Sequence, residues 1–63
     1  MIKYTTKRDT NGNRYTLIID HVTKSFTTDY NTSRCYDDYI TISKRDRKKL
    51  IDNLLLNNYT WNN

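Results

Sequence analysis

Apolar and polar residues alternate along the first half of the chain, in three runs that two polar turns separate. The first turn contains Asn11-Gly12, which favours a type I′ hairpin because both of its central residues need positive φ. A two-residue loop there places Tyr4 opposite Ile19 on one face of the hairpin. On the other face Asp9 lies opposite Arg14, and such pairs of opposite charges across a ladder favour this register.

The second turn spans Asp20 to Ser25. Placing these two residues opposite each other sets Phe26 across from Ile19, and the same register sets Tyr30 across from Tyr15. Both registers make the same face apolar, whereas a slip of one residue in either would move its apolar side chains to the opposite face. The two turns together predict a three-stranded antiparallel sheet with one buried face.

The second half of the chain predicts a loop over residues 31–38, a short strand and then a helix. In the strand, residues 39–42, we expect Ile40 and Ile42 to point into the core. Ser43 is a favourable N-cap with Asp46 at the position of a capping-box acid. The next apolar residues recur at helical spacing, and the stripe consists of Leu50, Ile51, Leu54 and Leu55. We expect this stripe to cover the apolar face of the sheet, and the helix to end near Asn57-Asn58.

These elements predict an α+β fold: a three- to four-stranded antiparallel meander with one C-terminal helix packed on one face, ββββα along the chain and in two layers. A chain of 63 residues forms one domain, residues 1–63, and buries roughly 60% of its unfolded surface. The apolar content is only 35%, but the aromatic content of 13% favours a folded chain over a disordered one.

The composition argues against several functional classes. A single cysteine, Cys35, forms no internal disulfide, which favours a reducing compartment, and we expect the cytoplasm of a host cell. One cysteine and one histidine, His21, are too few ligands for a zinc site. One glycine is too few for a phosphate-binding loop. The pair Asp37-Asp38 is more typical of solvated acids in a loop than of a cation site. Neither a membrane-length apolar run nor a signal-peptide pattern is present in the sequence. We therefore expect no enzymatic activity, no cofactor, no metal and no membrane partner.

Positive charge is concentrated at the start of the predicted helix. The net charge of +4 divides into +2 over residues 1–21, −1 over 22–42 and +3 over 43–63. The last segment is the most positive because the predicted helix begins with five cations, Lys44, Arg45, Arg47, Lys48 and Lys49. Cations in the first turn oppose the helix dipole by roughly 0.3–1 kcal/mol each, so stability alone would favour acids there. The cluster is therefore interpreted as a docking site for phosphate or for an acidic protein surface, with a solvated basic face as the alternative.

Helical spacing places Leu56 on the solvent side of the helix, where it could form an apolar patch with Trp61 beside the cations. The alternative is that Trp61 packs back onto the end of the helix. Arg47 lies near the apolar stripe, so its aliphatic stem is expected along the edge of the core. The expected partner-binding residues are Lys44, Arg45, Lys48, Lys49, Leu56 and Trp61.

Three stretches of sequence, residues 15–26, 40–46 and 54–59, resemble small accessory proteins of phages and mobile elements from low-GC bacteria. They read Tyr-Thr-Leu-Ile-Ile-Asp-His-Val-Thr-Lys-Ser-Phe, Ile-Thr-Ile-Ser-Lys-Arg-Asp and Leu-Leu-Leu-Asn-Asn-Tyr. Their motifs are structural, and no functional residue is carried over from them. The resemblance implies a protein that blocks or redirects host nucleic-acid enzymes, including CRISPR and restriction systems, or a small regulator.

The expected function is a non-enzymatic protein-binding module, an anti-CRISPR-like or anti-restriction-like inhibitor that docks on a host nuclease or similar protein through the basic helix start. The alternative is a small DNA- or RNA-binding regulator that uses the same helix edge. The sheet face that the helix leaves open carries charges of both signs, so it is expected to be a weak nucleic-acid reader. A homodimer that completes its core between two copies is a third alternative.

Overall fold

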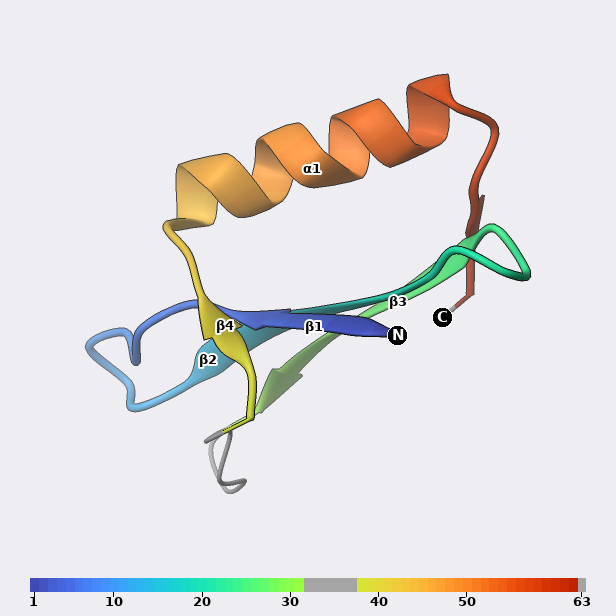
Figure 1. The fold of residues 1–63 in the computed structure, drawn as a ribbon. Helices are drawn as coiled ribbons and strands as arrows, with labels where there is room; N and C mark the ends of the chain where they lie inside the picture. The colour runs from blue at the N-terminus through green and yellow to red at the C-terminus, as the bar shows by residue number, and fades with distance from the viewer. Residues whose placement is uncertain (32–37, 63) are drawn as a thin grey trace.

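The computed structural model describes residues 1–31 and 38–62, which form an α+β fold in two layers. One helix, α1 (Lys44–Leu56), lies across one face of a five-stranded sheet (Figure 1). The strand order is β4-β1-β2-β3-β5, and the bounds are β1 (Ile2–Thr5), β2 (Arg14–Asp20), β3 (Ser25–Asn31), β4 (Ile40–Thr41) and β5 (Thr60–Trp61). The predicted α+β fold is confirmed, although the sheet is mixed rather than wholly antiparallel.

The hairpin of β2 and β3 has the predicted register. Asp20 pairs with Ser25, Ile19 with Phe26, and Tyr15 with Tyr30. The Asp20 carboxylate accepts hydrogen bonds from the backbone N–H groups of the next residues, Val22 at 2.9 Å and Thr23 at 3.3 Å. This local bonding closes the turn directly after the strand, so the apolar alternation and the turn chemistry specify the same register.

The hairpin of β1 and β2 differs from the predicted register by two residues. Tyr4 lies opposite Leu17, not opposite Ile19, which pairs with Ile2 instead. Because side chains alternate with a period of two, this shift leaves the same residues on the buried face. The predicted cross-strand pair of Asp9 and Arg14 is wrong, since β1 already ends at Thr5.

The shift has two sources: the loop is one residue wider than a type I′ turn, and Lys7 and Arg8 together lie opposite the single residue Arg14, between the pairs Thr6–Tyr15 and Asp9–Asn13. Gly12 N donates to Asp9 O at 3.0 Å, and Asp9 N donates to Asn13 O at 2.8 Å, so three residues form the loop. Gly12 has φ +79°, as in a type I turn followed by a left-handed glycine. The Asp9 carboxylate accepts from the backbone N–H groups of Asn11 and Asn13 at 2.9 and 3.0 Å, and these bonds stabilise the wider loop.

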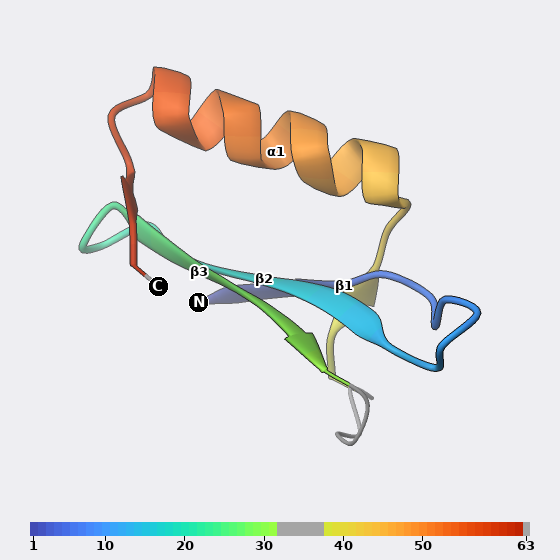
Figure 2. The same cartoon turned by 180° about the vertical axis from the view of Figure 1, so that it is seen from behind.

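Two short parallel strands lie at the edges of the sheet, β4 beside β1 and β5 beside β3. The prediction that Ile40 points into the core is wrong, because Ile40 is 54% exposed on β4, the edge strand of the sheet. Ile42 is half-buried, and its N–H donates to Thr5 O at 2.9 Å. The strand β5 was not predicted, and it brings the residues after α1 back beside β3 (Figure 2).

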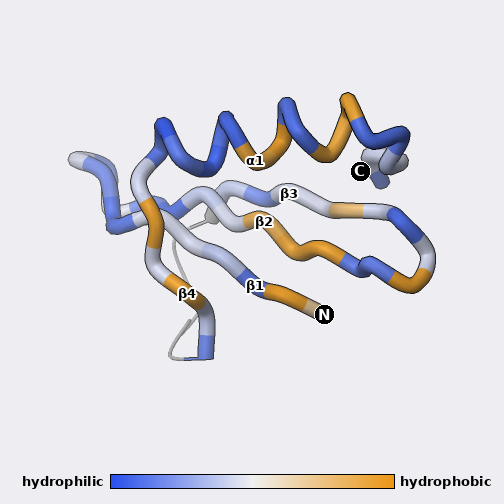
Figure 3. Tube along the Cα trace, turned by 45° about the horizontal axis from the view of Figure 1, so that its top comes forward, coloured by the Kyte–Doolittle hydropathy of each residue, from blue (hydrophilic) through white to orange (hydrophobic). Residues whose placement is uncertain are grey.

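The helix begins and ends as predicted. Ser43 Oγ accepts from Asp46 N at 3.0 Å at the N-cap, and Asn58 has φ 63° just beyond the last turn. Tyr59 N then donates to Leu54 O at 2.9 Å, which folds the chain back toward the sheet. The second half of α1 is rich in hydrophobic positions, as is β2 (Figure 3), and the buried core consists of Leu17, Ile19, Phe26, Ile51 and Leu54. Within the described residues, α1 is neither long nor apolar enough to cross a membrane.

Candidate functional site

The predicted partner-binding residues all lie at the surface, but they divide into two groups. Lys44, Lys48 and Trp61 line one hollow between α1 and the β3–β5 side of the sheet. The other three, Arg45, Lys49 and Leu56, are exposed on α1 and do not line it. The structure therefore brings together three of the six residues and adds neighbours that the sequence interpretation left out.

This hollow, called the helix-edge hollow below, has a volume of about 390 Å³. Its apolar side chains come from both layers of the fold, and they are Tyr15, Ile51, Leu55 and Trp61. Its charged side chains all come from α1, and they are Lys44, Arg47, Lys48 and Asp52. The arrangement combines an apolar interior with a largely cationic rim.

Tyr15 is held in place by three side chains. Lys44 Nζ lies 5.1 Å and Arg47 Cζ 5.3 Å from the centre of the Tyr15 ring, which are cation–π distances. The ring of Tyr30 lies 4.4 Å away, centre to centre, at an interplanar angle of 33°. The start of the helix is thus fixed over the end of the sheet by contacts between cations and aromatic rings.

Tyr30 is fixed in turn by the loop before β2. Its hydroxyl donates to Asp9 Oδ2 at 2.7 Å and accepts from Asn13 Nδ2 at 2.9 Å. The hydrogen bond from Tyr30, together with those from the backbone of Asn13 and Asn11, holds the pKa of the Asp9 carboxyl below its usual range. The same bond to Asp9 raises the pKa of Tyr30, so both groups keep their usual charges at neutral pH.

Arg47 joins the helix to the central strand of the sheet. Its Nε and Nη2 both donate to the carbonyl oxygen of Thr16, at 3.3 and 3.2 Å. Burial lowers the pKa of the guanidinium, but an arginine stays charged at physiological pH even so. Arg47 is half-buried, as expected from its place near the apolar stripe.

Trp61 is held by the strand that the sequence did not predict. Its ring centre lies 5.4 Å from that of Phe26, and its Nε1 donates to Thr28 Oγ1 at 3.1 Å. Leu55 lines the same hollow as Trp61, whereas Leu56, 80% exposed, does not. Trp61 therefore packs on the sheet, in a hollow that it shares with Leu55 of the last helical turn and not with Leu56.

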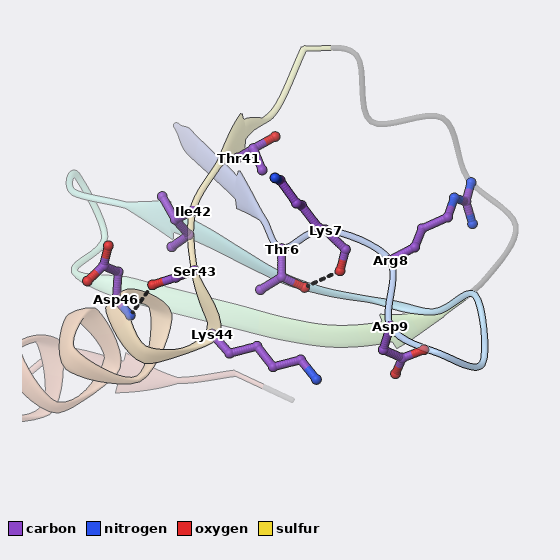
Figure 4. Close-up of a pocket in the computed structure, with 9 residues that line it drawn as sticks. All are labelled: Thr6, Lys7, Arg8, Asp9, Thr41, Ile42, Ser43, Lys44 and Asp46. Atoms are coloured by element: carbon purple, nitrogen blue, oxygen red, sulfur yellow. Dashed lines mark hydrogen bonds between the residues drawn. The ribbon is translucent and has the colours of Figure 1, made fainter.

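A second hollow of about 590 Å³ lies where the β1–β2 loop approaches the start of α1. Figure 4 shows its side chains: Lys7 extends toward Thr41, Arg8 projects outward from the loop, and Lys44 lies on the other side. The cations drawn there point apart, so they do not converge on a small anion.

The residues considered for catalysis are only partly described. His21 Nδ1 lies 2.7 Å from the hydroxyl of Tyr59, and both line a hollow of about 410 Å³ near the end of α1. Cys35 and Asp37 lie outside the described residues, and the carboxylate of Asp38 lies 3.5 Å from Lys3 Nζ. Residues 1–31 and 38–62 contain no group of three or more histidines, cysteines or acids that could hold a metal.

Comparisons of the chain with protein-family models, with curated proteins and with solved structures find no match. The geometry of the surface therefore carries the functional argument. Sequence reasoning missed Tyr15 and Leu55 as site residues because both belong to apolar faces expected to be buried. The available signal for Leu55 was its spacing of seven residues from Lys48, which places both on one face of the predicted helix.

Proposed function

We propose that this chain is a non-enzymatic binding module that docks onto an acidic surface of a partner protein through the first half of α1. The observation that carries the proposal is that Lys44, Arg45, Lys48 and Lys49 are all exposed. None of these four cations forms a salt bridge with a carboxylate of residues 1–31 or 38–62, whereas Lys3 does with Asp38. Unneutralised charge on one surface steers association and selects a partner of opposite charge.

The proposed partner is a host nucleic-acid enzyme, and the proposed effect is inhibition of the anti-CRISPR-like or anti-restriction-like kind. The resemblance to small phage proteins supports this class of partner. A protein that mimics nucleic acid would be acidic, whereas this chain has a net charge of +4. We therefore propose that it meets an acidic surface of the enzyme in the cytoplasm of the host cell, without occupying the nucleic-acid channel by mimicry.

The test is capture of partners by the tagged protein from a lysate of a low-GC bacterium, followed by an activity assay of any nuclease captured. The double variant Lys48→Glu/Lys49→Glu should lose the partner and the inhibition. The matched control Lys7→Glu/Lys24→Glu reverses the same charge outside α1 and should retain both. The proposal is wrong if no nucleic-acid enzyme is enriched, or if the first variant retains every partner.

A second candidate function, direct binding of DNA or RNA, has one observation in its favour. The aromatic rings of Tyr15 and Trp61 lie close to cations of α1, and proteins that bind single strands combine rings with positive charge. Gel-shift titration at two salt concentrations tests it. Sub-micromolar binding that weakens steeply with salt and is lost in Arg45→Ala/Lys49→Ala would support this function, and absence of binding would remove it.

A further inference from the structure

The interior of the helix-edge hollow exposes apolar surface from both layers of the fold. Leu55 and Trp61 border it with 47% and 45% of their surfaces exposed, and Ile51 lies at its base as part of the core. Covering such surface is favourable in proportion to the apolar area removed from water. A bulky apolar side chain from a partner would therefore gain affinity by entering between Leu55 and Trp61.

The rim of the hollow is cationic and partly pre-organised. Lys44, Arg47 and Lys48 stand three and four residues apart, so they lie on one face of the helix. Two of them are already fixed, Lys44 over the ring of Tyr15 and Arg47 on the carbonyl of Thr16. Binding groups held in place before association lose less side-chain entropy. Among residues 1–31 and 38–62, Asp52 is the one acid that lines the hollow, so the rim favours carboxylates.

The rings around the hollow are engaged with the protein itself, which argues against a nucleobase as the occupant. Tyr15 is contacted by two cations and by Tyr30, and Trp61 lies against Phe26 with its Nε1 bonded to Thr28. A stacked base would need an open ring face and would displace these contacts. As fixed walls of a hollow, however, the same rings suit an aliphatic or aromatic side chain.

We propose that the helix-edge hollow binds an acidic peptide segment of the partner protein that carries one bulky apolar residue. The apolar side chain enters between Leu55 and Trp61, and the flanking carboxylates pair with Lys44 and Lys48. This inference rests on the proposed function, because it names the part of the partner that the basic helix meets. It differs from simple charge attraction in requiring an apolar anchor.

Trp61 is the single tryptophan of the chain, so its fluorescence reports directly on the hollow. The probe is a short synthetic peptide in which a central leucine is flanked by aspartates and glutamates. We expect a blue shift of the emission, and binding about tenfold tighter than for the same peptide with a central alanine. A thymidine oligonucleotide of equal charge serves as the polyanion control and should bind more weakly than the leucine peptide.

Adjacent residues of α1 provide matched variants. Leu55→Ala should weaken binding of the leucine peptide about tenfold, whereas Leu56→Ala should leave it unchanged, because Leu56 does not line the hollow. Alanine is the better helix former, so both variants should keep their circular dichroism. Lys48→Gln should weaken binding a few-fold and Lys49→Gln by less, since only Lys48 lines the hollow.

The outcomes separate this inference from the proposed function. Equal binding of the leucine and alanine peptides, with loss in Lys48→Glu/Lys49→Glu, would reject the apolar anchor and leave charge-driven docking in place. Tighter binding of the oligonucleotide than of either peptide would reject the anchor and support direct nucleic-acid binding. If no anionic probe binds at all, the anchor and the basic docking surface are both rejected.

Discussion

The two halves of α1 have different roles, although they are one continuous helix. The first half, residues 44–49, carries five cations, and only Arg47 among these residues is half-buried. The second half, residues 50–56, supplies Ile51 and Leu54 to the core. Because stability resides mainly in the second half, the first half is free to carry charges that stability alone would not select. The exposed cations Arg45, Lys48 and Lys49 can therefore be changed separately from the core.

The largest effect is expected from the second half, in the variant Leu54→Ala. Leu54 is 7% exposed and packs in the core, so its truncation should cost about 2–5 kcal/mol of the free energy of unfolding. That loss is comparable to the whole stability of a domain of this size. Urea denaturation followed by circular dichroism measures it, and Leu56→Ala is the matched control with little expected change. Equal stability of the two variants would contradict the division of the helix.

Arg47 is the exception in the first half, and its replacement tests how much of that half is structural. Arg47→Lys keeps the charge but loses the paired donation by Nε and Nη2 to Thr16 O, so we expect a cost of about 1–2 kcal/mol in the free energy of unfolding. The same denaturation experiment on Lys48→Ala should show almost no loss. If Lys48→Ala costs as much as Arg47→Lys, the first half as a whole is structural and the comparison fails.

A smaller effect, of opposite sign, is expected at Arg45. It lies exposed in the first turn of α1, where a cation opposes the helix dipole, so Arg45→Gln should raise the free energy of unfolding by about 0.3–1 kcal/mol at low salt. Lys49→Gln lies beyond that turn and should change stability less. Thermal melts at low and high salt measure both. A stability gain accompanied by weaker capture of the partner would show that the charge serves docking; a loss of stability would refute that interpretation.

The smallest effect is a pH dependence near the wall of the helix-edge hollow. The pKa of Asp9 is held below its ordinary value of 3.8, first by the hydrogen bond from Tyr30. The Asp9 carboxylate of the unfolded chain therefore takes up a proton at a higher pH than that of the folded chain, so its stabilisation is complete only at about pH 5 and above and is lost as the pH falls through the folded pKa. Tyr30→Phe should reduce this acid sensitivity, measured by denaturation between pH 5 and 2, while the lowered pKa of Asp20 leaves part of it. An unchanged pH profile would contradict the assignment to Tyr30.

The sequence predicted those parts of the fold that depend on local pattern. The register of β2 and β3 followed from apolar alternation and a turn closed by Asp20, and the helix followed from Ser43 and the apolar stripe. The register of β1 could not be predicted in the same way, because the side chain of Asp9 favours a three-residue loop over the type I′ turn, and because Lys7 and Arg8 together lie opposite Arg14. Two residues of β5 are too few to show any alternation.

The candidate site was predictable in its charge and not in its shape. Consecutive cations are visible in any sequence, whereas the hollow depends on β5 bringing Trp61 beside Phe26, more than thirty residues away in the chain. The choice between Leu55 and Leu56 depends on a rotation of about 100° around the helix axis. Helical spacing already placed Leu55 in the apolar stripe and Leu56 on the solvent side, but tertiary packing decides that Leu55 borders the same hollow as Trp61.

The position of α1 between β4 and β5 has a mechanical consequence. The helix is joined at one end to the strand on one edge of the sheet and at the other end to the strand on the opposite edge. A partner that pulls on the helix therefore applies tension to both edges at once. Each edge strand is only two residues long, whereas β2 and β3 have seven residues each. Under such tension we expect the edge strands to detach before the central hairpin separates, with Trp61 leaving its place beside Phe26.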